Sequence, residues 1–303
     1  MRMTLPIFLQ NLANGILLGG LYALIAIGYS MVYGILRLIN FAHGDVFMMG
    51  TYFAFYGVTL FLLPWWLAFV VAIIGAGILG FLIDRIAYKP LRNAPRISSL
   101  ITAIGMSIFL ESLAVVIFGG IPKSFAPPRI YPKFFSKMLQ IGSVRVQILT
   151  FFILGITALL IIFLIWFVYK TKIGMAMRAI STDIATTALM GVNVDLVIGI
   201  TFAIGSALAG AGGILWAMKY PNVNPYMGFM PGLKAFIAAV IGGIGSIQGA
   251  MLGGFLLGMI EIMLVAFLPR FAGYRDIFAF IILIIILMYK PSGILGAKLE
   301  EKV

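Results

Sequence analysis

The residues of this chain that could do chemistry are few, and most lie within apolar stretches. The run Arg37-Leu-Ile-Asn-Phe-Ala-His-Gly-Asp45 contains the only histidine of the protein, between two long hydrophobic segments. Polar and ionisable groups are costly at membrane depth, so they are functional candidates there. Asn40 and His43 could satisfy backbone groups freed by a helix break that Gly44 permits. Alternatively, Asn40, Phe41, His43 and Gly44 face a translocation route, and we name them as pathway candidates.

Two carboxylates, Glu111 and Glu261, also lie within apolar stretches. They either form hydrogen bonds between helices or contact a transported substrate. A proton-coupled carrier would be expected to line a pathway with several such groups. Two clearly intramembrane acids therefore count against a proton-driven mechanism.

The residue types exclude most enzyme chemistry. One histidine and no cysteine leave no set of ligands for a multi-histidine or thiolate metal site, and no disulfide can form. The chain also has no G-x-x-x-x-G-K-[ST] phosphate loop. We therefore expect a protein that is not an enzyme, holds no cofactor and does not hydrolyse ATP itself.

The elements that must position these groups are membrane helices. Hydrophobic residues make up 63% of the 303 residues, charged residues make up 10%, and the mean hydropathy is +1.15. A helix needs roughly 20 apolar residues to cross the hydrocarbon core. The pattern predicts an all-α, polytopic membrane protein with eight or nine transmembrane helices. The first apolar stretch, 5–36, is too long for a signal peptide. The net charge of +12 is scattered, which favours contact with lipid headgroups over nucleic acid. The candidate spans are 5–36, 40–62, 65–83, 98–118, 148–169, 196–217, 233–246, 249–268 and 276–290.

Two of these segments are predicted to be broken or re-entrant. Residues 233–246 are short and rich in glycine, and 37–50 carry the polar run described above. Interrupted helices often line a transport pathway. Lys234, Gly242, Gly243 and Gly245 are therefore further pathway candidates. Small residues at four-residue spacing predict close helix packing, and they recur at Gly205, Ala209, Gly213, Gly245, Gly249, Gly253, Gly254 and Gly258.

Basic residues give an orientation. Four of them crowd the short loop 84–96, which favours the cytoplasmic side for that loop. The loop 119–147 is then external, although it carries five basic residues. The segment 170–195 and the C-terminus fall in the cytoplasm. Within 170–195 we predict a short amphipathic helix, capped by Ser181 or Thr182 and ended by Gly191, that docks into another protein or lies on lipid.

Three motifs resemble the permease subunits of branched-chain amino acid ABC importers, of the LivH type. They are Gly-Leu-Tyr-Ala-Leu-Ile-Ala-Ile-Gly-Tyr-Ser-Met-Val-Tyr-Gly (20–34), Ile-Asn-Phe-Ala-His-Gly (39–44) and the glycine-rich run 228–250. The resemblance covers nearly the whole chain, including Pro-Ser-Gly-Ile-Leu-Gly at 291–296. The chain differs from many relatives at three places. Many relatives carry an acidic residue and paired alanines where this chain has Ile184 and the pair Thr186-Thr187, and they often have proline where it has Gln248.

The resemblance implies a single transmembrane permease domain over 1–303, in the bacterial inner membrane. Its implied partners are a second, LivM-type permease, two cytoplasmic ATPase subunits that bind ATP and Mg, and an external substrate-binding protein. The loop that faces the ATPases would include Gly174, Arg178, Ala179, Asp183, Ala188, Leu189 and Gly191. Closure of the ATPase pair would pull on this loop and rock the bundle around a route bordered by 37–50 and 228–249.

Two other functions stay open from the sequence. A same-family importer of urea or short amides would carry very similar motifs. A protein of a different class, an ATP-independent channel or proton-coupled carrier, would transport without any ATPase.

Overall fold

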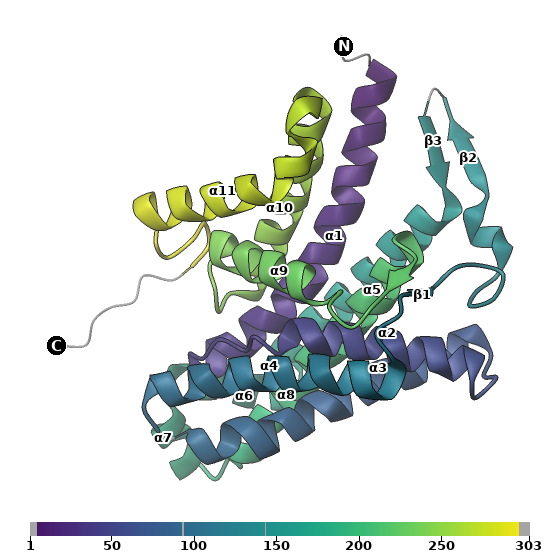
Figure 1. The fold of residues 1–303 in the computed structure, drawn as a ribbon. Coiled ribbons are helices and arrows are strands. Elements are labelled where there is room, and N and C mark those ends of the chain that lie inside the picture. The colour runs from purple at the N-terminus through teal and green to yellow at the C-terminus, as the bar shows by residue number, and fades with distance from the viewer. Residues whose placement is uncertain (1–4, 93, 143, 297–303) are drawn as a thin grey trace.

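The computed structural model describes residues 5–92, 94–142 and 144–296 (Figure 1). Most of this part of the chain is helical, as predicted. The helices are α1 (Leu5–Leu36), α2 (His43–Thr59), α3 (Trp65–Ile83), α4 (Arg96–Phe118), α5 (Ile148–Lys170), α6 (Lys172–Thr182), α7 (Ile184–Leu189), α8 (Val194–Lys219), α9 (Phe229–Gly242), α10 (Ile247–Phe267) and α11 (Arg275–Tyr289).

Within the described residues, seven helical segments are long and apolar enough to cross a membrane, and α9 is a shorter apolar helix. The prediction of an all-helical, polytopic membrane protein is confirmed, although the structure supports seven or, with α9, eight candidate spans in the described residues where eight or nine were predicted. Proline and glycine set several helix ends: Pro64 and Pro95 precede α3 and α4, and Gly119 ends α4 at φ +80°.

Small residues hold the bundle together. The antiparallel helices α1 and α10 are in direct backbone contact, because a Cβ added to Gly258 would lie 2.2 Å from the Gly19 nitrogen. A Cβ on Gly254 would lie 2.3 Å from the Ala23 nitrogen. Helix α8 packs in the same way against α2, where Gly210 faces Gly50. The predicted role of the small-residue stripes in close packing is therefore confirmed.

The loop 119–147 contains short strands that the sequence did not predict. Strand β1 (Lys123–Ser124) pairs with β4 (Asn222–Val223), and β2 (Met138–Ile141) forms an antiparallel hairpin with β3 (Val144–Gln147). A 3-10 turn, η3 (Lys133–Ser136), precedes this hairpin, and a second, η4 (Pro269–Tyr274), joins α10 to α11. The sequence did not indicate these strands because strands of two to four residues carry almost no periodic signal.

Contacts between loops show which ends of the helices share a side. Helix α3 continues into a π-helical turn, η1 (Asp84–Tyr88), and a 3-10 turn, η2 (Lys89–Leu91). The Lys89 ammonium lies 2.7 Å from the Asp195 carboxylate, which joins the 84–96 loop to the end of segment 170–195. The β1–β4 pair lies at the opposite end of the bundle from α6 and α7 (Figure 1).

The end of the described chain returns to the side of the 84–96 loop. The Ile294 and Leu295 N–H groups donate to the carbonyls of Ile241 and Gly242, at 2.9 and 2.8 Å. The end of α9 lies beside the end of α1 through contact of Gly245 with Gly34. The predicted tail extends to 303, and residues 297–303 lie outside the described residues.

Candidate functional site

The predicted break between α1 and α2 is present at 37–42. Arg37 has φ +55°, a conformation that ends α1 sharply. Asn40 is almost fully buried; its side-chain oxygen accepts a hydrogen bond from the Tyr88 hydroxyl at 3.0 Å, and its carbonyl accepts one from the His43 N–H at 3.2 Å. Asn40 therefore satisfies groups freed by the break.

His43 begins α2 and is buried. Its Nε2 donates to the Ile25 carbonyl of α1 at 3.2 Å, because a carbonyl oxygen can only accept. Its ring lies 4.5 Å from the Tyr29 ring. In the same turn, the Asp45 carboxylate accepts a hydrogen bond from Ser107 of α4. This polar run ties α2 to α1 and α4.

The structure brings the two interrupted segments together. A Cβ added to Gly44 would lie 2.6 Å from the Gly228 carbonyl oxygen, so the starts of α2 and α9 are in backbone contact. At the end of α1, the Gly245 N–H donates to the Ser30 hydroxyl at 2.8 Å. The predicted pathway borders, 37–50 and 228–249, are therefore neighbours in space. Phe41 is half-buried and packs against the adjoining core.

The glycines that end α9 make a bend in which each has its own packing role. Gly243 and Gly245 have φ +112° and +93°, a region that favours glycine. Gly242 lies against Gly249 of α10, where a Cβ would meet the carbonyl oxygen at 1.8 Å. Gly243 lies against the C-terminal segment at Gly296. Close packing is therefore the observed role of Gly242 and Gly243, whereas Gly245 faces α1.

Lys234 and Glu261 form a buried ion pair, which the sequence did not predict. The Lys234 ammonium lies 2.8 Å from the Glu261 carboxylate and 2.6 Å from that of Asp276. Glu261 also accepts a hydrogen bond from the Tyr22 hydroxyl at 3.0 Å, and Arg275 approaches it to 3.3 Å. Two cations and two acids thus join α9, α10 and α11 to α1. Both members of the pair are about 5% exposed, so this geometry favours a structural role.

Glu111 lies half-buried on α4 and takes no part in that cluster. Glu111 and Glu261, which both lie within apolar stretches of the sequence, therefore have different surroundings in the structure.

The segment 170–195 forms two short helices rather than the single predicted one. The predicted cap at Ser181 or Thr182 is wrong: both hydroxyls donate back to the Arg178 carbonyl, at 2.7 and 3.2 Å. Asp183 caps α7 instead, accepting from the Thr186 N–H at 3.1 Å. An aspartate one residue further on fits the same sequence rule, because Asp, Ser and Thr are all preferred caps. The predicted end at Gly191 agrees with its φ of +82°.

Helix α7 presents apolar side chains to the outside. Only Thr187 is buried within it, whereas Leu189 and Met190 are 88% and 80% exposed. Ala179 and Ala188 are exposed as well, and the Arg178 guanidinium lies over the Tyr169 ring at 5.2 Å. Gly174, by contrast, is buried against α5, where a Cβ would lie 2.3 Å from the Val168 carbonyl oxygen.

A cluster of charges next to this segment was missed by the sequence reasoning, which used its basic members only to orient the chain. Arg92 pairs with both Asp84 and Asp195, and Lys89 also pairs with Asp195. An acid at the end of an apolar span, followed by basic residues, was the available signal.

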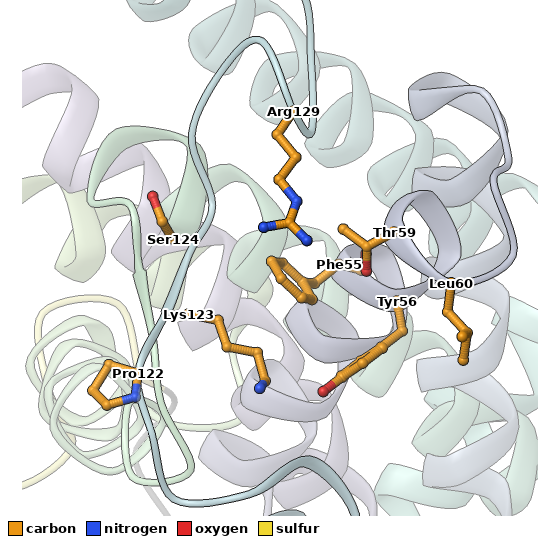
Figure 2. Close-up of a pocket in the computed structure, with 8 residues that line it drawn as sticks. All are labelled: Phe55, Tyr56, Thr59, Leu60, Pro122, Lys123, Ser124 and Arg129. Carbon is orange, nitrogen blue, oxygen red and sulfur yellow. The ribbon is translucent and has the colours of Figure 1, made fainter.

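A pocket of about 440 Å³ opens at the other end of the bundle (Figure 2). Figure 2 shows Lys123 and Arg129 pointing toward aromatic rings of α2. The Lys123 ammonium lies 5.8 Å from the centre of the Tyr56 ring, and the Arg129 guanidinium lies 6.0 Å from that of Phe55. The remaining lining residues are Thr59, Leu60, Pro122 and Ser124. Two cations over an aromatic floor make a site that attracts a carboxylate.

The bundle of apolar helices, with two interrupted segments in contact, defines a multi-pass membrane transport subunit. Residues 11–287 match the family model described as branched-chain amino acid transport system / permease component. The chain therefore belongs to this family of permeases. Its place among transport subunits agrees with the expectation that it is not an enzyme, and as one component of a transport system it works with partner subunits.

Curated relatives match over the full length. The chain is 44% identical over 307 residues to the high-affinity branched-chain amino acid transport system permease protein BraD of Pseudomonas aeruginosa, covering 98% of each chain. It is 43% identical over 312 residues to LivH of Escherichia coli K12, described in the same words, again covering 98% of each. Among solved structures, a chain of PsaBC from Streptococcus pneumoniae aligns with a TM-score of 0.49 and 14% identity, over 94% of this chain and 92% of that one.

Proposed function

We propose that this chain is the membrane permease of an ABC importer for leucine, isoleucine and valine, working with a second, LivM-type permease. The observation that carries the proposal is the full-length similarity to permeases named for high-affinity branched-chain amino acid transport. Two ATPase subunits in trans bind ATP and Mg, and an extracytoplasmic binding protein delivers the substrate. Asn40, His43 and the Lys234–Glu261 pair each have partners within the bundle, so the proposal assigns selection of the substrate to that binding protein.

The segment 170–195 is the docking site for the ATPases in this proposal. Its support is the exposure of Leu189 and Met190 on a short, capped helix. Exposed apolar side chains on a helix fit a groove in a partner protein. Arg178, Ala179, Asp183 and Ala188 lie in the same exposed segment, whereas Gly174 and Gly191 shape its start and its end.

The orientation follows from that docking. The ATPase side is cytoplasmic, and the loop 84–96 and the described end of the chain lie on the same side of the bundle, so the C-terminus is cytoplasmic and the protein spans the bacterial inner membrane. The loop 119–147 then faces outward. It carries five basic residues and no acid, and no acid occurs between Glu111 and Asp183. Such a surface attracts an acidic partner such as a binding protein.

Transport proceeds by movement of the interrupted segments. ATP binding closes the ATPases, which pull on 174–191 and rock the bundle. The contact of Gly44 with Gly228 is the place where 37–50 and 228–249 separate to open a route, and the contact of Gly34 with Gly245 is where 228–249 separates from α1.

The test is affinity purification of the chain from membranes in mild detergent, followed by leucine uptake in proteoliposomes. We expect a second permease and ATPases to co-purify, and uptake to require ATP. The variant Arg178→Glu should abolish ATPase recovery and uptake, whereas Arg145→Glu, on the outward loop, should retain ATPase recovery.

Three results would contradict the proposal. ATP-independent uptake by this chain alone would indicate a channel or carrier. Uptake of urea or short amides in preference to leucine would overturn the substrate assignment. Full ATPase recovery and uptake with Arg178→Glu would overturn the docking role.

A further inference from the structure

The docking segment is joined to the α3–α4 loop by ion pairs at its last residues. Asn193 caps α8 by accepting from the Leu196 N–H at 3.0 Å, and Asp195 lies in the first turn of that helix. Asp195 pairs with Lys89 at 2.7 Å and with Arg92. These ion pairs therefore connect the end of segment 170–195 to the 84–96 loop.

Arg92 carries the connection inward. Its second terminal nitrogen donates to both oxygens of Asp84, at 2.7 and 2.9 Å. The Asp84 side chain is completely buried, and that of Arg92 is 15% exposed. The Arg92 guanidinium therefore binds both oxygens of the Asp84 carboxylate and also the carboxylate of Asp195. This arrangement fixes the positions of the two carboxylates relative to each other.

Asp84 opens the π-helical turn η1, and Tyr88 closes it. A π-helical turn within a membrane helix is rare and is frequently found at functional sites. The Tyr88 ring packs 5.2 Å from Phe202 of α8, and its hydroxyl donates to Asn40 in the break between α1 and α2. One turn of helix is thus connected to the docking segment through Arg92 at one end and contacts the break at the other.

We propose that η1 transmits movement of the ATPase-docking segment to the 37–42 break, with Arg92 and Tyr88 as the positioning residues. The inference rests on the proposed function. In this arrangement Arg92 couples the start of α8 to η1, and the Tyr88 hydroxyl couples η1 to Asn40. Because Asn40 also holds the first N–H of α2, a rotation of η1 changes the start of α2, where α2 meets α9.

The decisive variant is Tyr88→Phe in the complete importer, because it removes one hydroxyl and leaves the ring in place. The matched control is Tyr131→Phe, since Tyr131 is also buried and donates a single hydrogen bond, to the Met218 carbonyl at 3.1 Å, at the opposite end of the bundle. The measured quantity is leucine transported per ATP hydrolysed. One hydrogen bond contributes about 1 kcal/mol, so we expect a fall of about fivefold for Tyr88→Phe and no change for Tyr131→Phe.

A double-mutant cycle tests whether the two residues act together. Arg92→Lys keeps the charge but loses the two-oxygen grip, and should also lower the coupling ratio with ATPase recovery unchanged. If both residues lie on one route, the double variant should resemble the worse single variant rather than the product of both.

The outcomes separate this inference from the function it rests on. A wild-type complex that neither recovers ATPases nor uses ATP for uptake overturns the proposed function. A wild-type complex that transports normally, together with a Tyr88→Phe variant of unchanged coupling ratio, overturns the relay alone. The relay is also overturned if Tyr88→Phe and Tyr131→Phe lower the coupling ratio equally. Independent effects of Arg92→Lys and Tyr88→Phe in the double-mutant cycle would overturn it as well.

Discussion

At the scale of single residues, the polar groups inside this bundle differ in what holds them. His43, Asn40 and Asp45 are each satisfied by one neutral hydrogen-bond partner on a neighbouring element. Lys234 and Glu261 are satisfied by opposite charge, within a cluster of two cations and two acids. A single hydrogen bond to a neutral partner is exchanged during a movement at a smaller cost than a buried ion pair, in which a charge that loses its partner is strongly unfavourable. The first group therefore suits a moving break and the second a fixed anchor for α11.

The anchor role predicts the effect of removing one acid. Glu261→Leu leaves the two cations of the cluster with Asp276 alone. Removing one member of a buried pair costs about 3–5 kcal/mol, and the remaining Asp276 places this variant toward the lower value. We expect a clearly lower midpoint of thermal unfolding in detergent.

Neutralising both members provides the internal comparison. The double variant Lys234→Met/Glu261→Leu restores charge balance and should recover most of the lost stability. Glu111→Leu, which removes an acid outside the cluster, should leave the midpoint near that of the wild type. A double variant as unstable as Glu261→Leu would show that the pair does not act as a unit.

At the scale of elements, contact between helix backbones determines the packing. In lipid, apolar side chains give helices no preference for one another, so close backbone approach must supply the stability. The α1–α10 contact shows this most clearly, because Gly258 and Gly254 lie directly on the α1 backbone. A side chain at these positions has no space unless the two helices separate.

This contact predicts a sharp difference between two glycines. Gly258→Val would place its Cβ 2.2 Å from the Gly19 nitrogen, and overpacking of this kind costs about 1–3 kcal/mol or more. Gly155 of α5 has no atom within 4 Å of an added Cβ, so Gly155→Val introduces the same side chain into open space. We expect Gly258→Val to lower the unfolding midpoint by several degrees and Gly155→Val to leave it almost unchanged. Equal midpoints would contradict the packing role of α10.

The same elements show what the sequence could predict. Apolar stretches, small-residue stripes and the two interruptions are local patterns, and the structure has helices, close contacts and breaks at those places. The pairings were not accessible in this way. Lys234 and Glu261 lie 27 residues apart in the sequence, and Arg92 and Asp195 lie 103 residues apart. Such pairs could not be predicted because a single sequence does not show which helices become neighbours. The cap of α7 was misplaced because Ser181, Thr182 and Asp183 are adjacent and chemically equivalent as caps.

At the scale of the whole molecule, charge is distributed unevenly along the chain. The net charge is +12, yet most of the acids described above lie in the bundle or in and beside the segment 170–195, where cations neutralise several of them. The loop 119–147 keeps five cations without an acid of its own. Uncompensated charge of this kind raises the rate of association with an oppositely charged protein and makes that rate sensitive to salt.

Two of these five cations, Lys123 and Arg129, line the pocket shown in Figure 2. Lys123 and Arg129 are held near Tyr56 and Phe55, so in the proposed function a carboxylate of the binding protein would meet both cations over an aromatic surface. We expect Lys123→Glu and Arg129→Glu to weaken delivery of leucine by the binding protein. The loss should be about tenfold or more, because like charges that oppose one another across an interface cost several kcal/mol.

Measurement of leucine uptake against concentration of the binding protein, at low and high salt, separates this effect from a general change in charge. Lys133→Glu makes the same change at an exposed position outside the pocket and should raise the half-saturating concentration much less. Salt screens charge over about 10 Å at 0.1 M, so wild-type delivery should weaken as salt rises, and the charge-reversal variants should lose most of that dependence. Equal effects of Lys133→Glu and Arg129→Glu would assign docking to the charge of the whole face, whereas unchanged delivery with both pocket variants would place the binding protein elsewhere on the complex.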